Sequence, residues 1–117
     1  MYQEELTLPV GILKDGRQLR KASLNNQTQR ITRAAQGHPD FLAAKDDYER
    51  GLVVFGHRLS VPELGEGPLS LDMMLDLDQD DINAIVDADG RLQARIRRFP
   101  DTAQGTDAGA SIPGASV

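Results

Sequence analysis

The sequence contains no cysteine and no tryptophan, and only 4% of its residues are aromatic. Without cysteine the chain can form neither a disulfide nor a thiolate metal site. With so few aromatic side chains, the core of this 117-residue chain has to be built mainly from Leu, Ile, Val, Met and Ala.

No apolar run approaches the roughly 18–20 residues of a membrane span, and the acidic N-terminus is unlike a signal peptide. We therefore expect one small intracellular domain with no membrane segment.

The net charge is -5, which disfavours a general role in binding nucleic acid, because such binding relies on neutralising phosphates. The charges are unevenly distributed. Basic residues gather between Lys14 and Arg33, and carboxylates gather between Asp72 and Asp89. The two regions could attract each other, copies of the chain could associate head to tail, or both regions could simply be solvated surfaces.

The first part of the chain predicts a β-hairpin over residues 5–24. Apolar residues alternate with small or polar ones at Leu6, Leu8, Val10 and Ile12, which is the periodicity of a strand. Asp15-Gly16 favours a two-residue turn. Leu19, Ala22 and Leu24 then supply the return strand. Because Pro9 has no N–H to donate, we expect the first strand to lie at a sheet edge or to be interrupted there.

The segment 26–97 predicts a bundle of three to four helices. The predicted helices are 27–36, 41–59, 71–77 and 78–97, and their N-caps are Asn25 or Asn26, Asp40, Ser70 and Asp78. In the last helix the predicted buried face is Ile82, Ile85, Val86, Leu92 and Ile96. A hairpin that turns at Asp89-Gly90 is the alternative for that region. Gly51 and Gly56 weaken the second helix, and they either permit close packing of another backbone or mark a bend.

These elements give an α+β fold in a single domain, residues 1–99. Residues 100–117 are small and polar, so they bury too little surface to offset the entropy of ordering. We therefore expect a flexible, disordered C-terminal tail over 100–117.

The aspartates of the acidic region raise the question of a calcium site. Asp76, Asp78 and Asp80 match the first three ligand positions of an EF-hand loop, but Asp81 stands where the loop requires Gly. Asp87 also replaces the final bidentate Glu. The stronger interpretation is that the aspartates start a helix, with Asp81 as a shortened form of the capping-box Glu.

No arrangement of residues predicts catalysis. No serine lies in a nucleophile-elbow pattern, and the two histidines, His38 and His57, have no ligand partners at a typical metal spacing. Gly65-Glu66-Gly67 lacks the remaining features of a phosphate-binding loop. We therefore predict a protein that is not an enzyme and has no cofactor or metal.

The sequence has more apolar residues than a small core needs. The segment 41–59 is apolar on more than one face, and methionine suits adaptable contact surfaces. A partner, or self-association, would cover such a surplus. The candidate contact residues are Leu52, Phe55, Leu59, Met73 and Met74.

Two segments are similar to a known family. Leu8-Pro9-Val10-Gly11, followed by Asp15-Gly16-Arg17, resembles the L-P-x-G opening of small tail assembly proteins of bacteriophages. The segment Ser70–Ile85, with its Asp78-Gln79-Asp80 helix start, resembles their L-L-x-x-D-x-D segment. The chain thus resembles the tail assembly chaperones of Mu-like and related phages over residues 6–96. It departs from them at Leu24-Asn25-Asn26, where a more acidic helix start is expected, and at Gly90.

This resemblance implies a non-enzymatic protein in the cytoplasm of the bacterial host cell. It would hold the tape-measure protein, or another tail protein, in solution while the tail tube polymerises. The alternative is a structural or adaptor subunit of a phage tail or baseplate. A calcium-responsive binding module is the third hypothesis.

Overall fold

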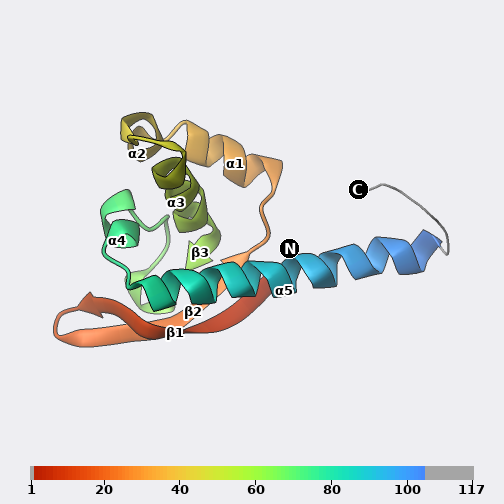
Figure 1. The fold of residues 1–117 in the computed structure, drawn as a ribbon, viewed down its shortest axis with the longest axis horizontal. Helices are drawn as coiled ribbons and strands as arrows, with labels where there is room; N and C mark the ends of the chain where they lie inside the picture. Colours follow the sequence, from red (N-terminus) through yellow and green to blue (C-terminus); the bar gives the residue numbers. More distant parts are fainter. Residues whose placement is uncertain (1, 105–117) are drawn as a thin grey trace.

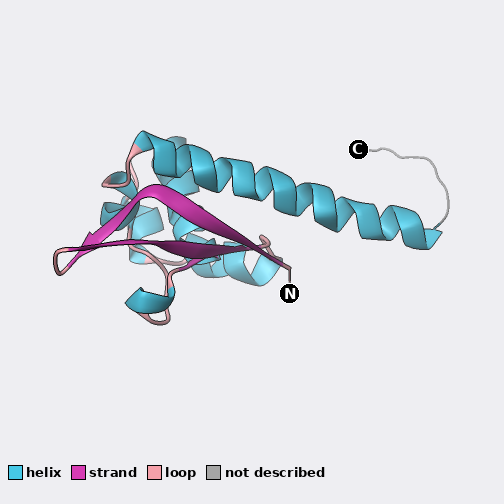
Figure 2. Cartoon of the chain, turned by 90° about the horizontal axis from the view of Figure 1, so that it is seen from below, coloured by secondary structure: helices cyan, strands magenta, loops and turns pink. Residues whose placement is uncertain are grey.

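The computed structural model describes residues 2–104 of the chain, and side chains as far as Arg97. The fold is α+β, as predicted: a three-stranded antiparallel sheet in the order β1-β2-β3, with the helices on one face (Figures 1 and 2). The elements are β1 Gln3–Lys14, β2 Arg17–Asn25, α1 Gln29–Gln36, α2 Pro39–Ala43, α3 Asp47–Arg58, β3 Leu59–Ser60, the 3-10 turn η1 Pro62–Leu64, α4 Leu71–Leu75 and α5 Gln79–Gln104.

The predicted hairpin is confirmed. β1 and β2 are antiparallel, and Lys14 lies opposite Arg17 across a two-residue turn. Both turn residues have positive φ, 52° at Asp15 and 77° at Gly16, as the tight hairpin turn requires. β3 adds a short third strand, with Leu59 opposite Leu24. The sequence analysis had assigned that leucine to a helix.

The pairing of β1 with β2 is irregular between Thr7 and Ile12. This agrees with the prediction for Pro9, because β1 is an edge strand and its ladder is interrupted at that point. The alternation predicted for the strand is wrong at Val10. The irregularity shifts the strand, so Val10 is exposed whereas Leu8 and Ile12 are buried.

The start of α1 differs from the prediction. Thr28 is the N-cap, and its hydroxyl accepts a hydrogen bond from the Ile31 amide at 3.2 Å. Asn25 cannot cap this helix because it is still part of β2, opposite Gln3. Helical spacing in the segment 27–36 predicts that Ile31, Ala34 and Ala35 face inward, and this is wrong for Ala34, which is exposed, whereas Ala35 is buried.

The single helix predicted over 41–59 is wrong. The N-cap of α2 is His38, not Asp40 as predicted: the His38 Nδ1 accepts from the Asp40 amide, and the backbone becomes extended at the C-cap, Ala44. A second helix, α3, then begins at Asp46, whose carboxylate accepts from the Glu49 amide at 2.9 Å. A single helix over 41–59 would place Leu42 on its apolar stripe, but because of this break Leu42 is 76% exposed.

The two later helix starts are confirmed. The Ser70 hydroxyl caps α4 by accepting from the Met73 amide, and the Asp78 carboxylate accepts from the Asp80 amide where α5 begins. α5 continues through Gly90, so the alternative hairpin at Asp89-Gly90 is wrong. The helix reaches Gln104, and residues 105–117 of the predicted tail lie outside the described residues.

The core lies between the covered face of the sheet and helices α3, α4 and α5. α5 packs along β1, and in the view of Figure 1 it crosses the sheet below α3. The buried core residues are Leu6, Leu8, Ile12, Leu19, Ala22, Leu24, Leu52, Leu59, Val61, Leu69, Met74, Ile85 and Ala88. Between residues 2 and 104, none of the helices has both the length and the apolar character that a bilayer span needs.

Candidate functional site: an apolar pocket between three helices

A pocket of about 290 Å³ lies between α3, α4 and α5. Its lining comes from all three helices and, apart from Asp47, carries no charge: Asp47, Tyr48, Gly51, Leu52 and Phe55 from α3, Met74 from α4, and Ile82, Ile85 and Val86 from α5. We call these residues the apolar pocket.

Helical spacing explains which residues meet there. Tyr48, Leu52 and Phe55 recur every three or four positions along α3, so they share one face of that helix. The deep part of the pocket is formed by buried residues, among them Leu52. Its rim is more open, since Tyr48 is 60% exposed and Val86 is 52% exposed. The exposed position of Val86 contradicts its predicted place on the buried face of α5.

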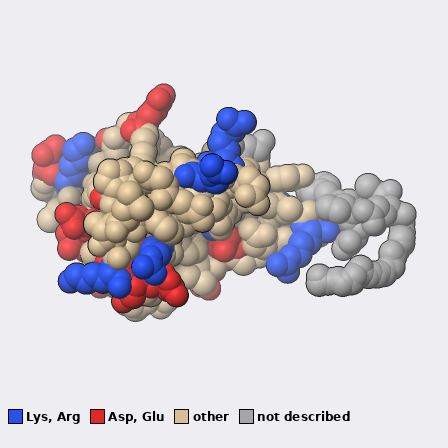
Figure 3. Space-filling view, turned by 90° about the horizontal axis from the view of Figure 1, so that it is seen from above, with Lys and Arg blue, Asp and Glu red and all other residues tan. Residues whose placement is uncertain are grey.

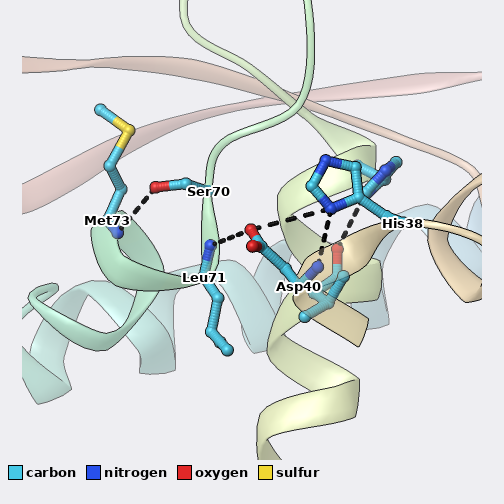
Figure 4. Close-up of polar contacts among 7 residues, drawn as sticks. His38, Asp40, Ser70, Leu71 and Met73 are labelled. Atoms are coloured by element: carbon cyan, nitrogen blue, oxygen red, sulfur yellow. Dashed lines mark hydrogen bonds and ion pairs between the residues drawn. The ribbon is translucent and has the colours of Figure 1, made fainter. Parts of the chain in front are cut away.

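A hydrogen bond from α2 fixes the short helix α4. The Asp40 carboxylate accepts from the Leu71 amide at 3.0 Å, and Ser70 satisfies the amide of Met73 (Figure 4). These contacts satisfy amides of the first turn of α4, which have no partner within a helix. They hold α4 in the orientation that places Met74 in the pocket.

Two glycines of α3 have opposite roles. A Cβ on Gly56 would lie 2.5 Å from the carbonyl oxygen of Leu69, and the Gly56 carbonyl accepts from the Leu69 amide at 3.0 Å. This glycine therefore lets the segment before α4 pack directly against α3, one of the two outcomes predicted from the sequence. A Cβ added at Gly51 would have no atom within 4 Å. Gly51 lines the pocket, so its missing side chain leaves open space at the pocket wall.

A buried arginine supports the inner side of the pocket. Arg58 is 2% exposed, and its guanidinium donates to the Asn25 carbonyl oxygen at 2.9 Å and to the Asp89 carboxylate at 2.6 Å. The same guanidinium lies 5.2 Å from the centre of the Phe55 ring. It thereby joins α3 to β2 and α5. The sequence analysis missed this residue, although a charge inside an apolar run is the signal that would have marked it.

Asp81 is a fully buried carboxylate, with 0% exposure. Its two oxygens accept from the backbone amides of Val10 at 2.8 Å and Gly11 at 2.9 Å. The capping-box role predicted for Asp81 is therefore wrong, because its side chain reaches across to β1 instead of turning back to its own helix. No local sequence signal points to this contact, since the partners are about 70 positions apart.

The acidic region does not assemble as an ion loop. Asp78 caps α5 and Asp81 binds β1. Over the part of the chain that the structure describes, no group of three or more His, Asp or Glu side chains could hold a metal ion. His38 and His57 do come together, with ring centres 5.2 Å apart in an edge-to-face arrangement, a contact that the sequence did not predict.

The structure brings together three of the five predicted contact residues. Leu52, Phe55 and Met74 line the apolar pocket. Leu59 lies in β3 within the core, and Met73 is half-buried and packs against that core. The sequence analysis did not select Tyr48, Gly51 or Val86 as contact residues, although they form the accessible part of the pocket.

Acidic residues dominate the chain around α4 and the start of α5. No Lys or Arg occurs between Leu59 and Gly90, and Asp76, Asp80 and Asp87 are exposed there. The surface over α1 and α3 is largely uncharged in its middle, with charged side chains toward its edges (Figure 3). The segment that carries α4 and the start of α5 is therefore acidic, whereas the lining of the apolar pocket has one charged residue, Asp47.

Comparisons of the chain with protein-family models, with curated proteins and with solved structures found no match.

Proposed function

We propose that this protein is a non-enzymatic phage tail assembly chaperone. It binds the tape-measure protein through the apolar pocket, in the cytoplasm of the bacterial host, and releases it as the tail tube polymerises. The short motifs around Leu8-Pro9-Val10-Gly11 and Asp78-Gln79-Asp80 favour this class of protein.

The observation that supports the proposal most directly is the apolar pocket itself. Its nine lining residues include one charged side chain, and two large residues at its rim, Tyr48 and Val86, are more than half exposed. Exposed apolar surface that is concave and surrounded by polar residues typically marks a binding site. The lining offers few polar groups to orient a small substrate, which favours a protein segment as the ligand.

Co-expression tests the proposal. The full chain is tagged and produced with fragments of the tape-measure protein encoded by the same phage, and complexes are isolated by affinity and size-exclusion chromatography. We expect a complex with at least one fragment. Tyr48→Asp and Val86→Asp should weaken it by about tenfold or more, since each places a carboxylate in the apolar pocket.

Leu13→Asp is the matched control. Leu13 is 73% exposed and lies at the end of the hairpin, so the same change of chemistry there should leave the complex intact. If the unaltered chain forms no complex with any fragment at high concentration, the chaperone proposal fails. If mass spectrometry finds the chain as a stoichiometric component of purified particles, it is a structural or adaptor subunit.

A further inference from the structure

We propose that Asp15 is a modification site, at which the chain slowly converts aspartate into isoaspartate, whereas the fold protects Asp89 from the same reaction. The sequence contains two Asp-Gly pairs, Asp15-Gly16 and Asp89-Gly90. The same reactive dipeptide therefore occurs in two different structural settings, a hairpin turn and a helix. This proposal does not depend on the proposed function.

Isoaspartate forms from an Asp-Gly pair without an enzyme. The glycine nitrogen attacks the side-chain carboxyl carbon of the aspartate, and a C–N bond forms. A carboxyl oxygen leaves as water, together with the amide proton and the carboxyl proton, which gives a five-membered succinimide ring. Water then opens the ring: attack at the side-chain carbonyl restores aspartate, and attack at the main-chain carbonyl gives isoaspartate. One water is released and one is consumed, so the reaction needs no further reactant. Glycine favours ring closure because it has no Cβ to obstruct the approach.

The Asp15-Gly16 pair is accessible and unrestrained. It forms the two-residue turn between β1 and β2, and both residues are exposed. Within the described part of the chain, no hydrogen bond or ion pair holds the Asp15 carboxylate or the Gly16 amide. Ring closure requires rotation about the Cα–C bond of Asp15. The turn leaves room for this rotation, since even a Cβ added at Gly16 would meet no atom within 4 Å.

The Asp89-Gly90 pair is held by its backbone and by its side chain. It lies inside α5, where the helix fixes the torsion that has to rotate and engages the Gly90 amide in its hydrogen-bond ladder. The Asp89 carboxylate accepts from the Arg58 guanidinium at 2.6 Å and from the Gln93 side-chain amide at 3.3 Å. Because Arg58 is 2% exposed, release of this carboxylate would leave a buried charge unpaired. Reaction at Asp89 therefore requires local unfolding of α5.

The modification would open the closed end of the hairpin. Isoaspartate carries the main chain through its side chain, so the backbone of the turn gains one methylene group. We expect the last pair of the ladder, Lys14 opposite Arg17, to separate, and with it the ion pair of Arg17 with Glu63 of η1 at 3.0 Å. The core begins further in, with Ile12 opposite Leu19, so the fold should persist.

Ageing of the purified full chain tests the proposal. The protein is incubated for several weeks in native buffer and in denaturing guanidinium chloride, and isoaspartate is located by peptide mass spectrometry with electron-transfer fragmentation. In native buffer we expect at least about tenfold more isoaspartate at Asp15 than at Asp89, because the helix has to open first. In the denatured chain the two sites should react at similar rates. Comparable amounts at both sites of the native protein would overturn the proposal, as would modification of Asp15 only after denaturation.

Two variants of the turn test the route. Asp15→Asn reaches the same succinimide by losing ammonia, so isoaspartate should accumulate at position 15 faster than in the unaltered chain. Asp15→Glu would need a six-membered ring, so it should remove most of the signal that isoaspartyl methyltransferase detects in the native protein. Both variants should remain folded by circular dichroism, since residue 15 is exposed and its side chain holds no partner among the described residues. A signal that persists in Asp15→Glu would place the modification at another residue and refute the proposal.

Discussion

The carboxylate of Asp81 accepts a hydrogen bond from the backbone amide of Gly11, 2.9 Å away, although the two residues are 70 positions apart in the sequence. The same carboxylate accepts from the amide of the preceding residue at 2.8 Å. These amides lie in the irregular part of β1, where pairing with β2 is interrupted, so the carboxylate takes the place of the missing ladder partner. The contact fixes the first turn of α5 on the sheet, and with it one wall of the apolar pocket.

Replacing Asp81 with Ala should be strongly destabilising. The change leaves the two part-buried amides of Val10 and Gly11 without their acceptor, and hydrogen bonds to a charged acceptor are the stronger kind. We expect the free energy of unfolding to fall by about 2–4 kcal/mol, measured by urea denaturation. The control is Asp87→Ala, an exposed aspartate on the same helix, which should change stability by no more than about 0.5 kcal/mol. Equal effects of the two changes would mean that the contact with β1 contributes nothing.

Gly11→Ala should destabilise the fold for two separate reasons. Gly11 has φ +95°, and a Cβ there would lie 2.7 Å from the Leu19 carbonyl oxygen. Gly16 has φ +77° but open space around it, so Gly16→Ala isolates the backbone cost. We expect thermal and urea melts to show a loss of about 1 kcal/mol for Gly16→Ala and at least about 2 kcal/mol more for Gly11→Ala. Similar losses at the two sites would show that the steric contact relaxes.

The helical glycines should respond to alanine with opposite signs. Gly56→Ala places a Cβ 2.5 Å from the Leu69 carbonyl oxygen, so it should lower the free energy of unfolding by about 1–3 kcal/mol. Gly51→Ala and Gly90→Ala meet no atom within 4 Å and should raise it by about 0.5–1 kcal/mol each. Differential scanning calorimetry of the three variants measures this. A stabilised Gly56→Ala variant would contradict the close approach of α3 and the segment before α4.

The buried ion pair of Arg58 and Asp89 should be strongly coupled. Removing one partner leaves the other side chain's charge uncompensated, and the Arg58 side chain is 2% exposed. In a double-mutant cycle with Arg58→Met and Asp89→Ala, each single change should cost about 2–3 kcal/mol, and the double change should cost at least about 1 kcal/mol less than their sum. The exposed pair Arg50 and Asp47 is the control, with an expected coupling below about 0.5 kcal/mol. Additive effects at Arg58 and Asp89 would refute the coupling.

Local signals predicted those parts of the fold in which neighbours in the sequence determine the structure. The Asp15-Gly16 turn and the caps at Ser70 and Asp78 each depend on a few adjacent residues, and all three are confirmed. Where a competing local signal was stronger, the prediction was wrong. Asp46 starts a new helix, which divides the segment 41–59, and β2 continues to Asn25, which moves the start of α1 to Thr28.

For the candidate site, the sequence alone determined that Leu52, Phe55 and Met74 belong to segments with apolar residues at helical spacing. It also determined that the surrounding segment would be acidic. Only the tertiary structure decided that these three line one pocket and that Leu59 does not, because that outcome depends on how α3, α4 and α5 pack on the sheet. It also decided the role of Asp81, since a carboxylate at a helix start looks the same in sequence whether it is solvated or bound to a strand 70 residues away.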